Sequence, residues 1–441
     1  LEANHGTALF NTFTVGGHPL TSVFETDEDN VNFHTAIKAE KSSEYIIEEN
    51  HIVADPAATD STHGILIVNG GDESLELYKN TYHNLSSASI AVGDNQDFEG
   101  SYGLRFICNQ NFNNRHDFEI RKDDDLNFGH IDLFQSGLES DLQAAANTFS
   151  PGDGLNDNYV NIDFYSDDDY IYRYDETAQN QTPNPDEIYV SNGSFTLEDG
   201  GTANTCPTHF PSGGVVMEPG DVLTELGKYQ NAKVGYYNLT YTYHQFIDKG
   251  NTEGTLNDIA LAWPEDAWAM RNELMRRSPY NSDTVLIAAA DKNIMPHGML
   301  LEVLIANPDA LRGGKVIDHV ACCIPEPLST YMIDILESAK DTRTARTVME
   351  HNMSNLHAQM SRAHRKLMLH YLTDSAGTHP DTLIAWYDEM KTREGRYALA
   401  FEHVNQGHFL EARVALDSLE NSLRLTNAQK TELAETRKYI T

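Results

Sequence analysis

The chain has 441 residues, of which 40% are hydrophobic and 9% aromatic, a composition that argues against disorder and suits two or three folded domains. The formal net charge is −36, and residues 1–250 hold 11 basic residues against 41 acidic ones. Such a negative field repels phosphate backbones, so nucleic acid is not expected as a partner. No apolar run approaches the roughly 20 residues that a membrane-spanning helix requires.

A repeated pattern of short apolar runs occupies residues 35–137. The first runs of successive repeats centre on Ile37, Ile65, Ile90 and Phe118, which lie 28, 25 and 28 residues apart. The runs alternate apolar and polar residues, as strands with one buried face do. Two or three short strands in each repeat of about 28 residues are typical of one coil of a right-handed parallel β-helix.

Alignment of the repeats predicts which side chains stack between coils. Leu75, Leu104 and Ile131 take inward positions and predict a buried column. The next outward position holds Glu76, Arg105 and Asp132. The corner positions hold Asn50, Asn80 and Asn109, where a ladder of amides can satisfy the backbone of the turns.

Changes in composition divide the chain into three predicted domains, so the fold class is β plus α multidomain. Residues 1–165 are predicted to form the parallel β-helix, with further coils expected before Leu1 in the full protein. Residues 166–250 are rich in Asp, Tyr and Pro and predict an irregular cover. Residues 251–441 predict a solenoid of short paired α-helices, including one helix over 256–277 and a long one over 343–373. Residues 397–416 resemble a tetratricopeptide unit.

The order of these features resembles a family of large secreted proteins of Bacteroidota that are exported by the type IX route. The matching motifs are Gly64-Ile-Leu-Ile67, Tyr78-Lys-Asn80, Cys108-Asn109, Ala146-Asn-Thr-Phe-Ser150, Cys206-Pro207 with Gly213-Gly214, and Leu274 with Ser278-Pro-Tyr-Asn-Ser-Asp-Thr-Val-Leu286. The resemblance implies β-helix coils, a Cys-Pro loop and a helical region, on the outer cell surface or outside the cell. It supplies no active site.

The four cysteines fall into two groups. Cys108 ends a predicted strand and Cys206 lies in the Cys-Pro loop, so the two are candidates for a disulfide, although the sequence does not set the distance between them. Cys322 and Cys323 are adjacent on an apolar segment and are predicted to be buried thiols.

Sequence motifs of serine hydrolases, phosphate-binding loops and zinc proteases are not found. The outward column of Glu76, Arg105 and Asp132 is the candidate catalytic site, because an Arg between two carboxylates can bind a uronate and assist proton abstraction. The favoured interpretation is a surface charge ladder, in which each pair contributes at most about 1 kcal/mol.

Two further sets of residues raise the question of metal binding. The candidate calcium ligands are carboxylates in acidic loops, namely Asp123, Asp125, Asp153, Asp157, Asp167 and Asp169, for which solvated turns are the simpler interpretation. The predicted helix over 343–373 carries His351, His357, His364 and His370 beside an apolar stripe. Neighbours seven positions apart lie about 10 Å apart along a helix, so core-flanking histidines are favoured over a metal site.

The sequence thus predicts a non-enzymatic, secreted or cell-surface structural or adhesion protein that requires no cofactor, with calcium as the one candidate. The helical domain is predicted to mediate self-assembly or contacts with other surface proteins, and glycans are a further class of ligand. The alternative function is that of a β-helix polysaccharide lyase or hydrolase.

Overall fold

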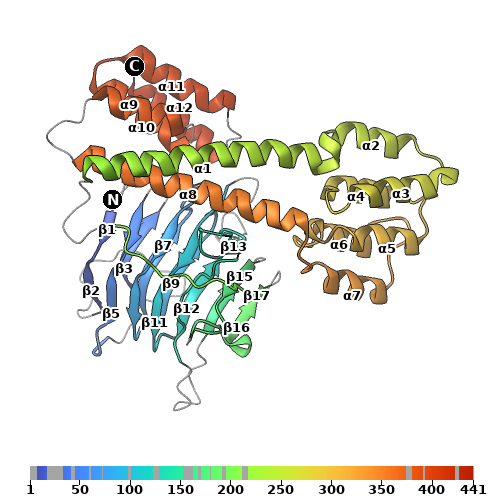
Figure 1. Ribbon diagram of the computed structural model, residues 1–441, viewed down its shortest axis with the longest axis horizontal. Helices are drawn as coiled ribbons and strands as arrows, with labels where there is room; N and C mark the ends of the chain where they lie inside the picture. Colours follow the sequence, from blue (N-terminus) through green and yellow to red (C-terminus); the bar gives the residue numbers. More distant parts are fainter. Residues whose placement is uncertain are drawn as a thin grey trace.

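The computed structural model describes most of the chain. The described residues are 7–16, 33–40, 45–58, 61–71, 73–97, 101–122, 129–140, 142–151, 162–166, 170–178, 180–190, 195–210, 217–373, 380–390, 393–422 and 427–440. Their strands lie between Thr7 and Asp199, and their α-helices between Pro219 and Tyr439 (Figure 1). None of the described helices is both long enough and apolar enough to cross a membrane.

The described strands form four sheets in which all neighbours are parallel. The first contains β1 (Thr7–Leu9), β4 (Ile46–Glu48), β7 (Glu76–Tyr78) and β10 (Arg105–Ile107). The second contains β2 (Thr12–Val15), β5 (His51–Ala54), β8 (Thr81–His83) and β11 (Gln110–Phe112). The third has six strands, β3 (Phe33–Glu40), β6 (Ser61–Val68), β9 (Ser87–Val92), β12 (His116–Arg121), β14 (Ile162–Ser166) and β16 (Ile188–Val190). The fourth has β13 (Phe134–Gln135), β15 (Tyr170–Tyr174) and β17 (Phe195–Asp199).

This architecture corrects the predicted fold class. In place of one long right-handed parallel β-helix, the described strands are distributed over four short parallel sheets of four, four, six and three strands. The predicted irregular cover over 166–250 is also wrong, because it contains strands β15 to β17 and the whole of a 28-residue helix, α1 (Pro219–Phe246). The repeat period specified which strands pair, but it carried no information on how far each sheet extends.

One corner of the sheets repeats in every round of strands. The residue before each corner asparagine has a left-handed backbone, with φ of 56° at Glu49, 54° at Lys79 and 61° at Cys108. The asparagine amides then form a ladder, in which the Asn50 backbone N–H donates to Asn80 Oδ1 at 3.0 Å and the Asn80 N–H donates to Asn109 Oδ1 at 3.0 Å. The ladder was predicted from the spacing. It satisfies buried backbone groups that a strained turn would otherwise leave unpaired.

The core of the strand region lies between the sheets. Leu75, Leu104 and Ile131 are buried in one hydrophobic cluster with Leu77 and Phe106, as the alignment of repeats predicted. Because strand side chains alternate between faces, the neighbouring positions on the first sheet must point out of this core. The outward column of that sheet is therefore defined by the same register.

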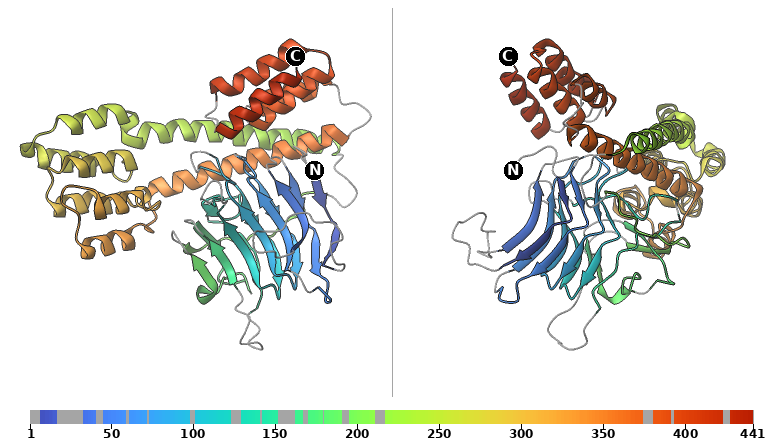
Figure 2. Two further views of the ribbon diagram at one scale, coloured as in Figure 1. Left: turned by 180° about the vertical axis from the view of Figure 1, so that it is seen from behind. Right: turned by 60° about the vertical axis from the view of Figure 1, so that its left-hand side comes forward.

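The helical region falls into three groups rather than one solenoid. Helices α1 and α8 (Ala345–Thr373) lie side by side, and α8 runs along the top of the sheets (Figures 1 and 2). Between them in the chain comes a stack of six helices, α2 (Thr252–Leu261), α3 (Ala267–Arg277), α4 (Asp283–Lys292), α5 (His297–Ile305), α6 (Lys315–Cys322) and α7 (Thr330–Ala339). The last group is the C-terminal bundle of α9 (Pro380–Met390), α10 (Arg393–Asn405), α11 (Phe409–Ser422) and α12 (Asn427–Tyr439).

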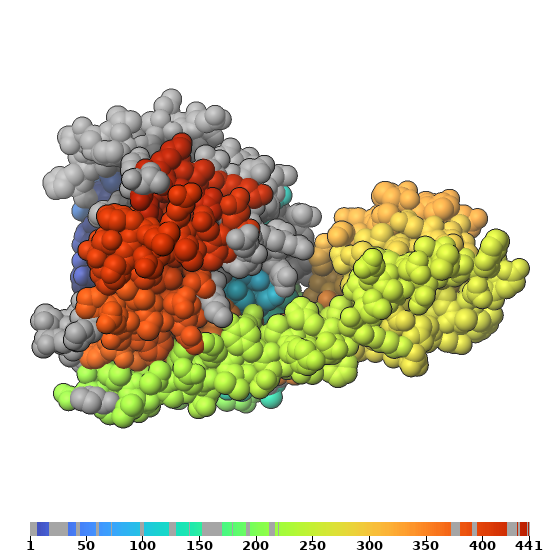
Figure 3. All heavy atoms as spheres, turned by 90° about the horizontal axis from the view of Figure 1, so that it is seen from above, coloured from blue at the N-terminus to red at the C-terminus, as the bar shows by residue number. Residues whose placement is uncertain are grey.

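The stack has two rows of helices. Helices α2, α4 and α6 contact one another in sequence, and α3, α5 and α7 form the second row. The helix predicted over 256–277 is two helices, because Pro264 follows Trp263 and cannot continue the hydrogen bonding of α2. The stack projects away from the sheets on the far ends of α1 and α8, opposite the C-terminal bundle (Figures 1 and 3).

Candidate functional site

The structure brings the three residues of the outward column together. Arg105 pairs with Glu76 in the register of β10 and β7, and Arg105 Nε donates to Asp132 Oδ2 at 2.8 Å. The column is not on the surface, however. The exposed fractions of Glu76, Arg105 and Asp132 are 8%, 0% and 1%. The prediction that these charges lie on the surface is therefore wrong, because another part of the chain covers them.

The covering element is helix α8, which provides a partner for each charge of the column. Arg362 forms a bidentate ion pair with Glu76, with Nη2 at 3.0 Å from Oε1 and Nε at 3.1 Å from Oε2. Arg105 Nη1 donates to Asn355 Oδ1 at 2.7 Å, and Ser354 Oγ donates to Asp132 Oδ2 at 2.7 Å. A buried charge without a partner costs several kcal/mol. The column is thus adapted to hold this helix.

The contact between α8 and the sheets is called the seam below. Its α8 side includes His351, Ser354, Asn355, His357, Ala358, Gln359, Arg362 and Arg365. Of these, His351, Asn355, Ala358, Arg362 and Arg365 follow a spacing of three or four residues, so they lie on one face of the helix, with Ser354 and His357 beside it. The spacing of these polar residues was the sequence signal for the seam. It was missed because the apolar residues beside them gave a stronger helical pattern.

Two histidines of α8 take part in the seam as neutral groups. His357 Nδ1 lies 2.8 Å from Ser74 Oγ, and its ring stacks on Tyr102 with centroids 3.4 Å apart. His351 Nε2 lies 2.7 Å from Ser136 Oγ. Burial lowers the pKa of His357 to about 3 and holds the pKa of His351 well below its ordinary value, with nearby arginines acting in the same direction. Both imidazoles therefore act as neutral hydrogen-bonding groups at neutral pH.

A second covering segment, residues 202–210, is called the strap below. Asn204 Nδ2 donates to the Ala144 carbonyl at 3.3 Å, Tyr78 Oη donates to the Pro207 carbonyl at 2.8 Å, and the His209 N–H donates to Glu48 Oε1 at 3.0 Å. The strap therefore crosses the first sheet towards its earlier strands. A disulfide between Cys108 and Cys206, whose Cα atoms are 5.8 Å apart, joins it to the sheet.

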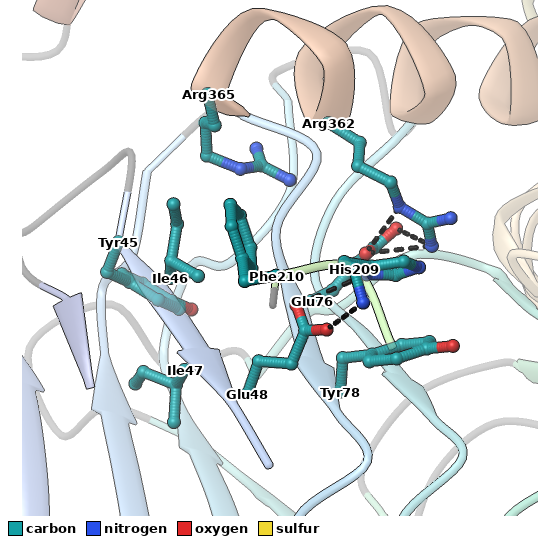
Figure 4. Close-up of a pocket in the computed structure, with 10 residues that line it drawn as sticks. All are labelled: Tyr45, Ile46, Ile47, Glu48, Glu76, Tyr78, His209, Phe210, Arg362 and Arg365. Atoms are coloured by element: carbon teal, nitrogen blue, oxygen red, sulfur yellow. Dashed lines mark hydrogen bonds and ion pairs between the residues drawn. The ribbon is translucent and has the colours of Figure 1, made fainter. Parts of the chain in front are cut away.

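A small cavity lies where the strap, α8 and strands β4 and β7 meet (Figure 4). It has a volume of about 20 Å³, which is room for about one water molecule. The lining residues are Tyr45, Ile46, Ile47, Glu48, Glu76, Tyr78, His209, Phe210, Arg362 and Arg365. A sugar ring does not fit into a space of this size.

Glu48 and His209 are the titratable pair beside this cavity. Glu48 Oε2 lies 3.2 Å from His209 Nδ1, and both side chains are almost fully buried. Burial raises the pKa of Glu48 to about 8, although the His209 N–H and Arg362 oppose this. Burial and the positive charge of Arg362 lower the pKa of His209. At neutral pH the site therefore favours two uncharged partners that share one proton.

A larger hollow lies between α2 and α3, in the stack. Its volume is about 350 Å³, and the structure leaves it open to solvent. It is lined by Thr255, Asp258, Ile259, Leu261, Ala262, Asp266, Ala269, Met270, Glu273, Leu274 and Arg277. We call it the α2/α3 groove. No groove was predicted from the sequence, because the one continuous helix predicted over 256–277 contains none.

The sequence also predicted candidate calcium ligands and two buried thiols. Asp123, Asp125, Asp153, Asp157, Asp167 and Asp169 all lie outside the described residues. Within the part of the chain that the structure describes, no three His, Cys, Asp or Glu side chains are placed to hold a metal ion. Cys322 and Cys323 are exposed and joined to each other by a disulfide, so the prediction of buried thiols is wrong.

Comparison of the chain with protein-family models, with curated proteins and with solved structures finds no match in any of the three. The function therefore has to be inferred from the seam, the strap and the groove themselves.

Proposed function

We propose that the chain is a non-enzymatic structural protein of the outer cell surface or the extracellular space, in which the sheets form a rigid body and the helices mediate assembly. The observation that carries this proposal is the closed seam. The charged column suited to a uronate is covered by α8, and Glu76, Arg105 and Asp132 each have a partner on that helix. The outward face of the first sheet serves as a docking surface for the chain's own helix.

The two disulfides support the extracellular location. Cys108 pairs with Cys206, and Cys322 pairs with Cys323. Disulfides persist in secreted and surface proteins and are rare where thiols are kept reduced. Export by the type IX route of Bacteroidota, which the resemblance implies, agrees with this location and is part of the proposal.

The shape of the helical region supports an assembly role. Helices α1 and α8 hold the stack away from the sheets (Figure 2). The stack exposes large apolar side chains, among them Leu261, Trp263, Trp268 and Tyr331. Exposed aromatic and aliphatic side chains on a projecting element are typical of protein interaction surfaces.

The test of this function is an assay for turnover by the intact chain. Pectin, alginate and chondroitin are incubated with the protein, with and without calcium, and release of unsaturated uronate is followed by ultraviolet absorbance. We expect no release. Release that is lost in the Glu76→Gln variant, measured at a temperature where circular dichroism shows that variant to be folded, would replace the structural function by the alternative of a polysaccharide lyase.

A further inference from the structure

Cys322 and Cys323 form a disulfide between neighbouring residues at the end of α6, and this bond connects no distant parts of the chain. A disulfide stabilises a fold mainly by closing a loop in the unfolded chain, and the effect grows with the length of that loop. The Cys108–Cys206 disulfide joins residues 98 positions apart, whereas the Cys322–Cys323 disulfide joins residues 1 position apart. The second bond therefore adds almost nothing to stability through loop closure.

Other contacts hold the backbone around the pair. Val320 and Ile324, on either side of the two cysteines, are both buried in the core of the stack. The Cys323 N–H donates to the His319 carbonyl at 2.8 Å, and the Leu328 N–H donates to the Val320 carbonyl at 3.0 Å. Opening the disulfide leaves all of these contacts in place. The end of α6 therefore does not need the bond to keep its conformation.

The two disulfides also differ in their access to solvent. Cys322 and Cys323 are both exposed, and α6 belongs to the stack that projects away from the sheets (Figure 1). Cys108 is 2% exposed and packs in one apolar cluster with Cys206 and with Ala358 of α8. A thiolate has to reach a disulfide sulfur in order to attack it, so exchange depends on access. The Cys322–Cys323 bond is the more accessible of the two.

Covalent geometry makes the exposed bond easy to reduce. The Cα atoms of disulfide-linked residues usually lie about 4.4 to 6.8 Å apart, and a departure from this range makes the bond more reducible. Neighbouring residues cannot reach the range, because one peptide unit fixes their Cα separation, which is 3.7 Å here. Exposed disulfides of this kind are the ones that take part in exchange rather than in holding a fold.

We propose that the Cys322–Cys323 disulfide is a site of thiol–disulfide exchange that accepts two electrons from a dithiol. One thiolate of the dithiol attacks the sulfur of one cysteine, which forms a mixed disulfide and breaks the bond within the pair. The released electron pair and one proton go to the other cysteine. The second thiolate of the dithiol then attacks the first donor sulfur and expels the bound cysteine, which takes up the second proton. The donor is left as a disulfide and the pair as two thiols.

A dithiol is the donor because the two cysteines are neighbours. After attack by a monothiol, the released thiol of the pair lies beside the mixed disulfide and expels the monothiol again. A dithiol completes the exchange with its own second thiol. The donor is either a small dithiol or a pair of cysteines in another protein. This activity goes beyond the proposed assembly function and does not depend on it.

The experiment treats the intact oxidised chain with a low concentration of dithiothreitol under native conditions, and maps free thiols by alkylation and peptide mass spectrometry. Cys322 and Cys323 are expected to become free at least about tenfold faster than Cys108 and Cys206, with about one dithiothreitol oxidised per chain. The monothiol 2-mercaptoethanol, at the same thiol concentration, should open the pair far less. A reduced peptide with two cysteines replaces dithiothreitol in a second arm, and the faster of the two donors identifies the source of the dithiol.

Variants separate exchange from folding. The double variant with Cys322→Ser and Cys323→Ser keeps the buried residues on both sides, so it is expected to melt as the unmodified chain does and to oxidise no dithiothreitol at this concentration. Ala321→Ser changes an exposed neighbour and should retain exchange. Equal rates of opening for the two disulfides would overturn the inference. Equal opening by the monothiol and the dithiol, or loss of helical circular dichroism when only the pair is reduced, would overturn it as well.

Discussion

The seam and the stack are two interfaces of the same chain that are built in opposite ways. The seam buries Arg105 and Asp132 as an ion pair, and it buries His357, which is hydrogen-bonded to Ser74. The interior of the stack is aliphatic, with Leu286 and Val303 fully buried in one cluster. Buried polar groups add little net stability but penalise every misplaced arrangement, whereas aliphatic packing stabilises and tolerates substitution. The polar contacts of the seam therefore determine where α8 packs on the sheets. The aliphatic packing of the stack stabilises the helices that form it.

The largest expected effect comes from breaking the seam at its centre. Arg105→Met leaves Asp132 buried without its cation, and this is expected to lower the free energy of unfolding by about 3 to 5 kcal/mol. Denaturant titration followed by circular dichroism measures the loss. Adding Asp132→Asn removes the uncompensated charge, so the double variant should recover part of the stability. A double variant no better than Arg105→Met alone would mean that the pair is not the source of the loss.

The matching change in the stack should have a somewhat smaller and more local effect. Leu286→Ala removes buried methyl groups and leaves a cavity, which is expected to cost about 2 to 4 kcal/mol. Hydrogen exchange should show lost protection in α2 to α7, while the backbone of β7 and β10 stays protected. Equal loss of protection in the sheets would show that the two interfaces unfold as one unit.

A third prediction uses the dependence of the seam on pH. The folded-state pKa of His357 is about 3, below its ordinary value of 6.5, so the unfolded chain binds a proton that the folded chain excludes. Stability is therefore present above pH 6.5 and is lost as the pH falls towards the folded pKa. Ser74, Tyr102 and Ser361 surround the ring, and Arg105 and Arg365 lower its pKa further.

The test replaces His357 by Gln, which keeps a polar group near Ser74 but does not titrate. Between pH 7 and pH 5 the unmodified chain is expected to lose about 2 kcal/mol more than this variant. His297→Gln in the stack is the control and should keep the full loss. The same pH dependence in the His357→Gln variant would exclude His357 as its cause.

The seam also shows what sequence could and could not predict. The stacking of Leu75, Leu104 and Ile131 and the amide ladder followed from a local period, because each residue meets its equivalent in the next repeat. Helix α8 could not be placed in that way. Asn355 is separated by 250 residues from Arg105, and no periodic signal connects a helix to a strand position so distant in the chain.

The stack shows the same limit of prediction from sequence, here within a few residues of the chain. Short paired helices were predicted for this part of the chain, since capping and breaking residues act locally. Trp263 and Pro264 separate α2 from α3, but the apolar period continues across them and predicted one helix. With that one break missed, the α2/α3 groove could not be seen. The groove depended on the turn between α2 and α3, whereas the helices themselves followed the apolar pattern.

The central claim is that the outward column of the first sheet is a docking face for α8, and a double-mutant cycle between Glu76 and Arg362 tests it most directly. The two residues are 286 positions apart in the sequence and form a bidentate ion pair only if α8 lies on the seam. Glu76→Gln, Arg362→Met and the double variant are unfolded by denaturant under the same conditions. The account predicts a coupling energy of about 2 kcal/mol. A coupling energy of zero, with each single variant folded, would contradict it.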